Sequence, residues 1–348
     1  MPADYRAMEP ALDFLSAYGP DLANGFTTHA PMVAEALAAL GRVDAVLPWL
    51  EAQRAGLLPR PAGRAPIAAD RWAEALGRYE RVGDWSDLFA RDLAAAPWRQ
   101  VLVRWTARLL PGLCAAAAHG VIRVGHAARS LADAETPLRV RELGDALALW
   151  AASYRVLPAS PVVGPALPAA AALARVPRVP AAQRVFTGTI VSSLEALDRF
   201  APFADVLGML AVDADPADTL SDLSETFARV FLANARDPLA AVVFVHAVTD
   251  VTAIRSLLAV LPPAVARVGT RYAWQASAAL YAAFATTAPA PGEVRPPRES
   301  AATLVDMAVA SGDDHAIKLT EACLREHARR PSPVYLAAVR RALAVLGS

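Results

Sequence analysis

A single lysine, Lys318, stands among 34 basic residues that are otherwise arginine, and it follows His315 by three positions in DDHAIKLTEAC. An arginine guanidinium stays charged in proteins, whereas a lysine amine that is removed from water can lose its proton and act as a nucleophile. A neutral amine can also take up carbon dioxide as a carbamate, which is an anionic oxygen ligand for a metal. The lone lysine is therefore a candidate for chemistry that arginine cannot perform.

The spacing of His315 and Lys318 supports two interpretations. At positions i and i+3 of a helix both side chains lie on one side, the geometry by which Glu-x-x-His pairs reach one metal in helical di-iron proteins. Four charged residues of this segment also recur at helical spacing: Asp314, Lys318, Glu321 and Arg325. Asp314 precedes Lys318 by four positions, the order that favours a surface ion pair. Under this second interpretation Lys318 is an exposed cation.

His246 lies in LAAVVFVHAVT, a stretch from 239 to 249 without any charge. A histidine in such surroundings is expected to be buried, and a buried imidazole needs partners for both nitrogens. Asp250, one helical turn later, could hold one nitrogen and leave the other for a metal. The alternative is a hydrogen-bonded core histidine.

His119, Arg123 and His126 fall on one face of an otherwise apolar helix, at i, i+4 and i+7. This polar stripe is expected to line an internal cavity or to touch solvent at a rim. Because seven residues rise about 10 Å along a helix, His119 and His126 are not expected to share a metal. One of them is then a supporting or substrate-facing group.

His29 stands just before the proline that opens a helix in TTHAPMVAEAL. A helix N-terminus disfavours the imidazolium form and keeps the ring neutral, as a metal ligand must be. The alternative is a solvated turn residue. His327 lies at a helix C-terminus, where a cation complements the helix dipole, and no ligand role is predicted for it.

Apolar residues at three- and four-residue spacing predict helices almost throughout, and β-branched alternation is nearly absent. The predicted helices are 32–40, 43–56, 68–79, 85–95, 98–132, 136–154, 181–199, 217–235, 238–261, 263–286, 299–311, 313–329 and 333–346. Thr136-Pro137 and a capping box from Ser311 to Asp314 mark two of the starts. Proline-rich connections occur near 58–66, 156–180 and 288–297. We expect one all-α domain over 1–348, with two closely packed lobes divided at 156–180 around an internal metal and substrate cavity.

The composition excludes several classes of function. With 55% apolar residues, 20% charged residues and zero formal net charge, the chain lacks the electrostatic footprint of a nucleic-acid or membrane-surface binder. The apolar stretch 157–174 contains prolines that would break a membrane helix. Without a secretory signal pattern, and with Cys114 and Cys323 expected as free thiols, a cytoplasmic protein is predicted. No dinucleotide fingerprint, P-loop or nucleophile elbow is visible.

Three segments carry a family resemblance: THAPMVAEALAALGR, the stretch from PWRQVLVRWTARLLPGL through AAHGVIRVGHAARSL, and DDHAIKLTEACLREH. Over most of the chain they resemble the questin oxidase-like family, with the histidine motifs in the same order. That family is known from fungal polyketide pathways, where members open anthraquinone-type rings oxidatively. They were long described as NADPH-linked Baeyer–Villiger oxidases.

The resemblance implies a mostly helical fold and a non-haem iron, Fe(II), held by histidines and a carbamylated lysine. The corresponding positions are His29 in THAPM, His119 in AAHGVIR, His246 in FVHAVT, and His315 with Lys318 in HAIK. Some relatives have an aromatic residue at the position of His126, which argues against a ligand role for that histidine. This chain is also shorter than the fungal members, so the identity of the substrate does not transfer.

The leading hypothesis is an iron-dependent oxygenase that uses O₂ to cleave, or insert oxygen into, a quinone-like polycyclic aromatic polyketide. His126 would donate or accept a proton and Arg123 would stabilise an oxyanion, with NADPH as a further reductant. The aromatic residues Trp105, Trp274, Tyr272 and Tyr281 would line an aromatic pocket or pack in the core. The alternatives are an NADPH-linked Baeyer–Villiger monooxygenase without iron, a non-catalytic helical scaffold with buried histidines, and a zinc hydrolase. The last usually needs two metals and an aspartate cluster, which the sequence does not show.

Overall fold

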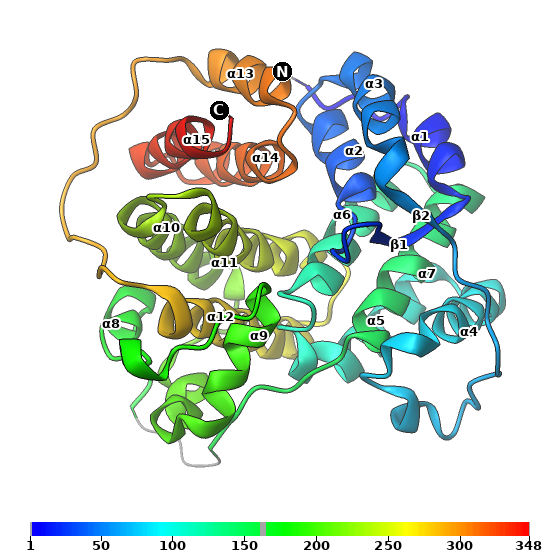
Figure 1. Cartoon of the computed structure of the whole chain (residues 1–348), viewed down its shortest axis with the longest axis horizontal. Helices are drawn as coiled ribbons and strands as arrows, with labels where there is room; N and C mark the ends of the chain where they lie inside the picture. Colours follow the sequence, from blue (N-terminus) through cyan, green and yellow to red (C-terminus); the bar gives the residue numbers. More distant parts are fainter. Residues whose placement is uncertain (1, 161–164, 348) are drawn as a thin grey trace. The chain divides into compact units, whose positions relative to one another are not determined.

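The structure is a computed structural model that describes residues 2–160 and 165–347. Within these ranges nearly all regular structure is helical, and the one sheet has two strands, so the predicted all-α fold is confirmed. The chain divides into two compact units (Figure 1). Unit 1 comprises Met1–Arg155 and Ala259–Leu261, and unit 2 comprises Val156–Leu258 and Pro262–Ser348. The boundary after Arg155 coincides with the start of the proline-rich segment.

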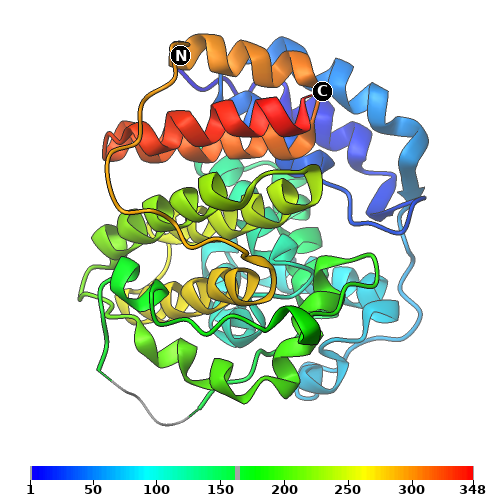
Figure 2. The same cartoon turned by 60° about the vertical axis from the view of Figure 1, so that its left-hand side comes forward.

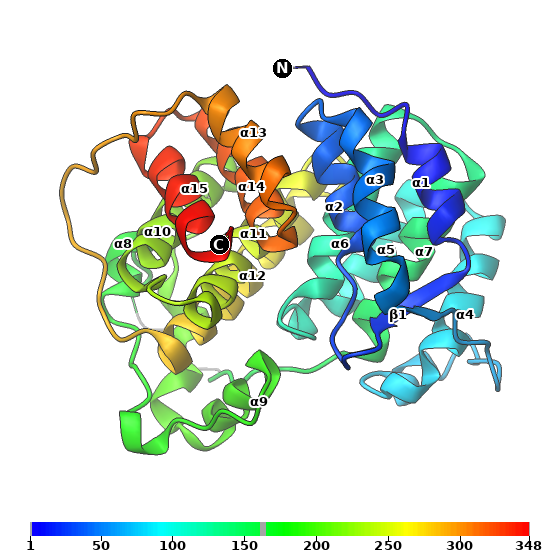
Figure 3. The ribbon, with the colours of Figure 1, turned by 45° about the horizontal axis from the view of Figure 1, so that its top comes forward.

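Unit 1 is built around α7, which packs along both α4 and α6. From Ala146 to Ala152 every side chain of α7 is apolar and buried, as expected of a central helix. Helix α2 packs against α3 and α6, as Figure 3 shows for α2 and α3. The elements are α1 (Met8–Leu15), β1 (Tyr18–Leu22), α2 (Ala30–Ala39), α3 (Val43–Gln53), η1 (Arg54–Gly56), β2 (Leu57–Pro59), η2 (Trp72–Ala75), η3 (Tyr79–Arg81), α4 (Val82–Ala95), α5 (Trp98–Leu109), η4 (Leu110–Gly112), α6 (His119–Asp133) and α7 (Pro137–Ala152).

The two strands of unit 1 were not predicted from the sequence. β1 and β2 pair antiparallel, with Tyr18 opposite Pro59 and Leu22 opposite Leu57. Both strands are short, and more than thirty residues of chain separate the paired positions, so no local alternation pattern predicts them.

Three predicted helices are corrected. The single helix expected over 98–132 is two helices, because Pro111 follows α5 and interrupts its hydrogen-bond ladder, and α6 begins only at His119. The segment 68–79 contains only short 3₁₀ turns. The segment 181–199 is likewise broken, into η5 (Ala181–Gln183), α9 (Ile190–Leu194) and η6 (Glu195–Arg199).

Unit 2 is built around α11, which packs against α10, α12 and α14. Figure 2 shows α13, α14 and α15, in orange and red, running alongside one another. Besides η5, α9 and η6, its elements are α8 (Ala169–Leu173), η7 (Ala201–Met209), α10 (Pro216–Asn234), α11 (Pro238–Leu257), α12 (Pro263–Phe284), α13 (Ala301–Ser311), α14 (Asp314–Arg329) and α15 (Pro333–Leu346).

Polar residues followed by proline start several helices of both units. The side chains of Thr136, Asp215, Asp237 and Ser332 each accept a hydrogen bond from a backbone N–H of the first turn. The predicted capping box at Ser311 is wrong, because the carboxylate of Asp313 accepts from the Ala316 N–H at 2.8 Å and is the N-cap of α14. Ser311 instead donates to the Ala308 carbonyl at the end of α13.

Helix α11 alone among the described segments is long and apolar enough to cross a membrane. In the structure 78% of its most apolar window is buried inside the protein. This burial is typical of the core helix of a soluble protein.

Candidate functional site

In unit 1, His29 and His119 lie against one another. His29 is the N-cap of α2 and His119 is the first residue of α6, and these two helices pack together. Their rings are stacked with centroids 4.7 Å apart, and the two Nε2 atoms are 2.5 Å apart. Two nitrogen lone pairs at this separation repel one another unless they share a proton or a cation. The pair is thus arranged to take up a positive charge.

The ring of His119 is oriented by the backbone that precedes α6. Its Nδ1 atom contacts the carbonyl oxygen of Ala116, three residues earlier. A carbonyl can only accept, so Nδ1 carries the proton and Nε2 is the basic nitrogen.

In unit 2, His246 on α11 and His315 on α14 form a second histidine pair, with ring centroids 5.3 Å apart in an edge-to-face arrangement. The Nδ1 atom of His246 lies 2.7 Å from the Val242 carbonyl. The sequence had suggested Asp250 for this contact. The Oδ1 atom of Asp250 instead accepts a hydrogen bond of 2.7 Å from Ser277, on α12.

His315 repeats the pattern, since its Nδ1 atom lies 2.6 Å from Asp314 Oδ1. In His119, His246 and His315 alike, an oxygen holds Nδ1 and leaves Nε2 as the basic nitrogen. Metal-binding histidines in proteins are oriented in this way, and the partner of the outer nitrogen fixes the tautomer. Imidazole nitrogen suits iron and zinc alike, so these residues fit Fe(II) without selecting it.

Lys318 lies one turn beyond Asp314 on α14 and is only 1% exposed. The interpretation of an exposed, ion-paired lysine is therefore wrong. Burial lowers the pKa of Lys318 to about 8, although Asp314 and Asp313 act in the opposite direction. At this pKa a substantial share of the amine is neutral under mildly alkaline conditions, and only the neutral amine reacts with carbon dioxide.

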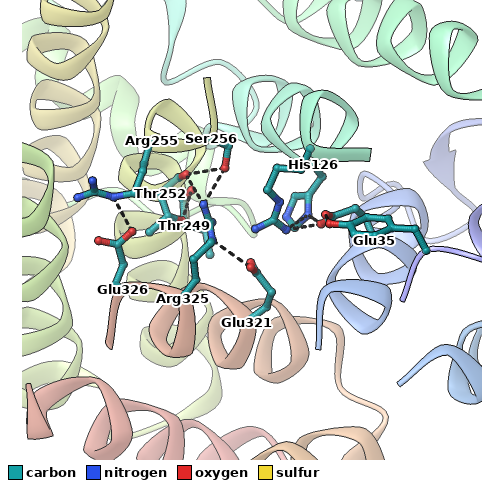
Figure 4. Close-up of polar contacts among 11 residues, drawn as sticks. Glu35, His126, Thr249, Thr252, Arg255, Ser256, Glu321, Arg325 and Glu326 are labelled. Carbon is teal, nitrogen blue, oxygen red and sulfur yellow. Dashed lines mark hydrogen bonds and ion pairs between the residues drawn. The ribbon is translucent and has the colours of Figure 1, made fainter. Parts of the chain in front are cut away.

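Charged side chains hold α11 and α14 of unit 2 together (Figure 4). Arg255 on α11 forms a 2.6 Å ion pair with Glu326 on α14, and both side chains are buried. Arg325 donates to the Ser256 hydroxyl at 2.8 Å and pairs with Glu321 at 3.0 Å. These contacts set the register of the two helices that carry His246 and His315.

In unit 1, His126 points toward Glu35, as Figure 4 shows. The Nδ1 atom of His126 lies 2.6 Å from Glu35 Oε2, Tyr5 donates to Oε1 at 2.7 Å, and Arg129 also pairs with the carboxylate. Burial by itself raises the pKa of Glu35, but Arg129 and His126 outweigh it and lower the pKa to about 2. Glu35 was not predicted as a site residue. It is the only charge in APMVAEALAA, the sequence of α2, and this isolation was the available signal.

Arg123, on the same helix as His126, is buried against α7. Its guanidinium donates to both oxygens of Glu142, at 2.6 and 2.8 Å. Two small hollows of about 10 Å³ each reach Arg123, and each has room for about one water molecule. The polar stripe on α6 is thus bound by carboxylates of α2 and α7.

A hollow of about 350 Å³ in unit 1 lies between α4 and α7. None of the residues predicted to act in the site lines it. Of the candidate pocket aromatics, Trp105, Trp274 and Tyr281 are buried and Tyr272 is partly exposed. Trp105 packs edge-on against Trp85 and Phe89, and the indole of Trp274 donates to the Val206 carbonyl.

Comparison with known proteins gives one family. The model described as "Questin oxidase-like" matches residues 26–323, which include every residue predicted above for the metal and the substrate. No curated protein matches the chain. Since the match covers most of the sequence, the chain belongs to the questin oxidase-like family, which suggests an oxidoreductase of the oxygenase class.

Proposed function

We propose that this protein is a non-haem iron-dependent oxygenase acting on a quinone-like polycyclic aromatic polyketide. The observation that carries the proposal is the shared orientation of His119, His246 and His315. Each ring has Nδ1 held by an oxygen and Nε2 as its basic nitrogen. Family membership supports the class of reaction.

In the proposal Fe(II) is bound by five residues, which are His29, His119, His246, His315 and Lys318. A bound Fe(II) would supply the activation of O₂ next to the reduced aromatic substrate. An internal cavity for that substrate remains a prediction.

Lys318 contributes the anionic ligand in this proposal. Its neutral amine attacks the carbon of CO₂, and the released proton passes to solvent, which leaves a carbamate with one negative charge. A carbamate on lysine reaches further from the backbone than the carboxylate of Asp or Glu. In the proposal this reach accounts for a lysine rather than Asp or Glu at this position, and the need for a neutral amine accounts for a lysine rather than the arginine used elsewhere in the chain.

His126 is the proposed proton donor and acceptor for the substrate. Glu35 holds its Nδ1–H, so Nε2 is the nitrogen that exchanges the proton. Arg123 is the proposed oxyanion partner. The N–H groups of its guanidinium that do not donate to Glu142 would donate to the oxyanion, directly or through a water. NADPH enters only as a source of electrons that keeps the quinone reduced.

Metal analysis of protein purified without chelator tests the proposal. We expect about one equivalent of iron per chain, and less than about a tenth in His119→Ala and in His315→Ala, because each removes a ligand of the same ion. His327→Ala is the matched control on α14 and should keep the iron, since the His327 Nδ1 atom contacts the Ser332 carbonyl beyond the helix end. Wild-type protein without bound metal would refute the proposal, and iron halved in each variant would indicate two separate sites.

The same samples test the carbamate. After exposure to carbon-13 bicarbonate, the wild type should show a labelled carbamate signal in the carbon spectrum. Lys318→Arg should show none, because a guanidinium does not become a neutral nucleophile. A signal of equal size in both proteins would assign the carbamate to another amine.

A further inference from the structure

The backbone directly before His119 adopts a conformation that L-amino acids avoid. Ala116, Ala117 and Ala118 have φ values of 48°, 55° and 67°, three consecutive residues in the left-handed region. In this region the Cβ atom comes too close to the following carbonyl oxygen, so runs of non-glycine residues are rare. Such a run persists only where the surroundings impose it, and strain of this kind clusters at functional sites.

Two glycines that flank the turn show what imposes it. Gly112 lies under the ring of Tyr154, where an added Cβ would be 2.4 Å from a ring carbon, and its carbonyl accepts a 3.1 Å hydrogen bond from the Trp150 indole. Gly120 lies against Trp150 itself, where an added Cβ would be 2.6 Å from the Trp150 Cα atom. Both ends of the segment are thus fixed at one end of α7.

The distance between these anchors forces the chain to double back. Trp150 contacts both anchors, because its indole N–H donates to the Gly112 carbonyl and its Cα and Cβ atoms lie against Gly120, so the two glycines are separated by no more than about one tryptophan side chain. The chain from Gly112 to Gly120 could reach over 25 Å if extended, by the ~3.3 Å that each residue can span. It must therefore fold into a compact turn before α6 begins, and the left-handed turn meets this requirement.

The turn places one carbonyl in contact with two nitrogen atoms of His119. The Ala116 oxygen accepts from the backbone N–H of His119 at 3.2 Å and also contacts Nδ1 of its ring. The ring is therefore locked between the Ala116 carbonyl at Nδ1 and His29 at Nε2.

We propose that the left-handed turn Ala116–Ala118, anchored by Gly112, Gly120 and Trp150, is a positioning element that fixes the tautomer and orientation of His119 before any metal binds. The part concerning the metal rests on the proposed function. The part concerning the ring is independent of it, because it describes the metal-free chain.

The test is Ala116→Gly in the full, metal-free chain. Ala116 is partly exposed, so the substitution removes little packing while it removes the Cβ that opposes a positive φ. The melting temperature should rise, by about 1–2 °C for a chain of this size. Ala115→Gly is the matched control. Ala115 is buried outside the left-handed run, and glycine there should lower the melting temperature.

The second readout is the ring itself. In nitrogen-15 histidine spectra, assigned with His119→Gln, wild-type His119 should be a single Nδ1–H tautomer. Ala116→Gly should convert it to a mixture of tautomers, because a glycine turn no longer holds the carbonyl in place. The apparent Kd for Fe(II) should rise about tenfold, the usual effect of losing a group that orients a metal ligand.

Two outcomes would overturn the inference. A lower melting temperature in Ala116→Gly would show that the turn is not strained. A single tautomer with unchanged iron affinity would show that the turn does not position the ring. If the wild type binds no iron, the proposed function fails, while the tautomer and melting results still decide this inference.

Discussion

The two histidine-bearing regions treat buried charge in opposite ways. In unit 1 the carboxylate of Glu35 is surrounded by Tyr5, His126 and Arg129, and its pKa falls to about 2. In unit 2 no carboxylate pairs with Lys318 among the residues that the structure describes, and burial lowers its pKa to about 8. Burial likewise raises the pKa of Asp250 well above its ordinary value. Glu35 thus keeps its charge, whereas burial favours the neutral forms of Lys318 and Asp250.

The difference in pairing suggests a structural role for the Glu35 network of unit 1 and a chemical role for Lys318 in unit 2. A satisfied carboxylate holds α2 and α6 in register and so maintains the His29–His119 pair. An amine without an ion pair is reactive, since losing its proton relieves the cost of burial. Helix α14 shows the contrast within itself, because Glu326, two turns beyond Lys318, is paired with Arg255.

The largest effect is expected from Glu35→Gln, which breaks the charged network of unit 1. Removing one member of a buried ion pair typically costs 3–5 kcal/mol, and we expect about 3 kcal/mol of the free energy of unfolding near neutral pH. The folded pKa of about 2 lies below the ordinary 4.5. The contribution of Glu35 is therefore present above pH 4.5 and is lost as the pH falls toward 2. Urea unfolding across this range measures both effects.

Glu80→Gln is the control for this experiment. Glu80 is exposed in η3, and the change should stay within about 0.5 kcal/mol. A stability difference between wild type and Glu35→Gln that persists below pH 2 would contradict the assignment to the carboxylate charge.

Lys318→Met should change stability in the opposite direction. In bicarbonate-free, metal-free protein it removes a buried cation, and we expect a gain of up to about 3 kcal/mol near neutral pH, from 1.36 kcal/mol per unit of pKa shift. The unfolded chain binds more protons between the folded pKa of about 8 and the ordinary 10.5. Wild-type stability therefore rises with pH through this window, and the advantage of Lys318→Met disappears. Thermal melts at several pH values measure this.

Lys318→Arg is the companion variant. A guanidinium cannot lose its proton, so this variant should be less stable than the wild type at every pH in the window. Equal stability of Lys318→Met, Lys318→Arg and wild type would mean that the side chain reaches water, which would remove the contrast between the two regions.

The smallest effect concerns the start of the helix that carries His315 and Lys318. Asp313→Ala removes the N-cap of α14 and should cost about 1 kcal/mol, the usual value for a lost cap. Ser311→Ala, at the position that the sequence suggested as the cap, should cost less than half of that. If chemical unfolding shows that Ser311→Ala loses more free energy of unfolding than Asp313→Ala, then Ser311 is the cap, as the sequence suggested.

Much of the helical framework could be predicted because it depends on residues that are close together in the sequence. Helices such as α10, α11, α12 and α15 follow from apolar spacing and from a polar residue or a proline before Pro at their starts. The break between α5 and α6 was missed, since the alanine run at 115–118 has high helix propensity. Its left-handed turn depends on Gly112 and Gly120 meeting α7, a contact that no local pattern contains.

The sequence by itself determined the helical class, the family and the histidines worth testing, because periodicity, motif order and residue type are properties of the chain. Only the tertiary structure decided that Lys318 is buried, that Glu35 binds His126, and that Asp313 rather than Ser311 caps α14. The first two depend on which side chains other helices place nearby, whereas the cap depends on where the chain leaves α13 and enters α14. The physical reason is that burial and pairing set the charge of a group, and neither is fixed until the helices pack.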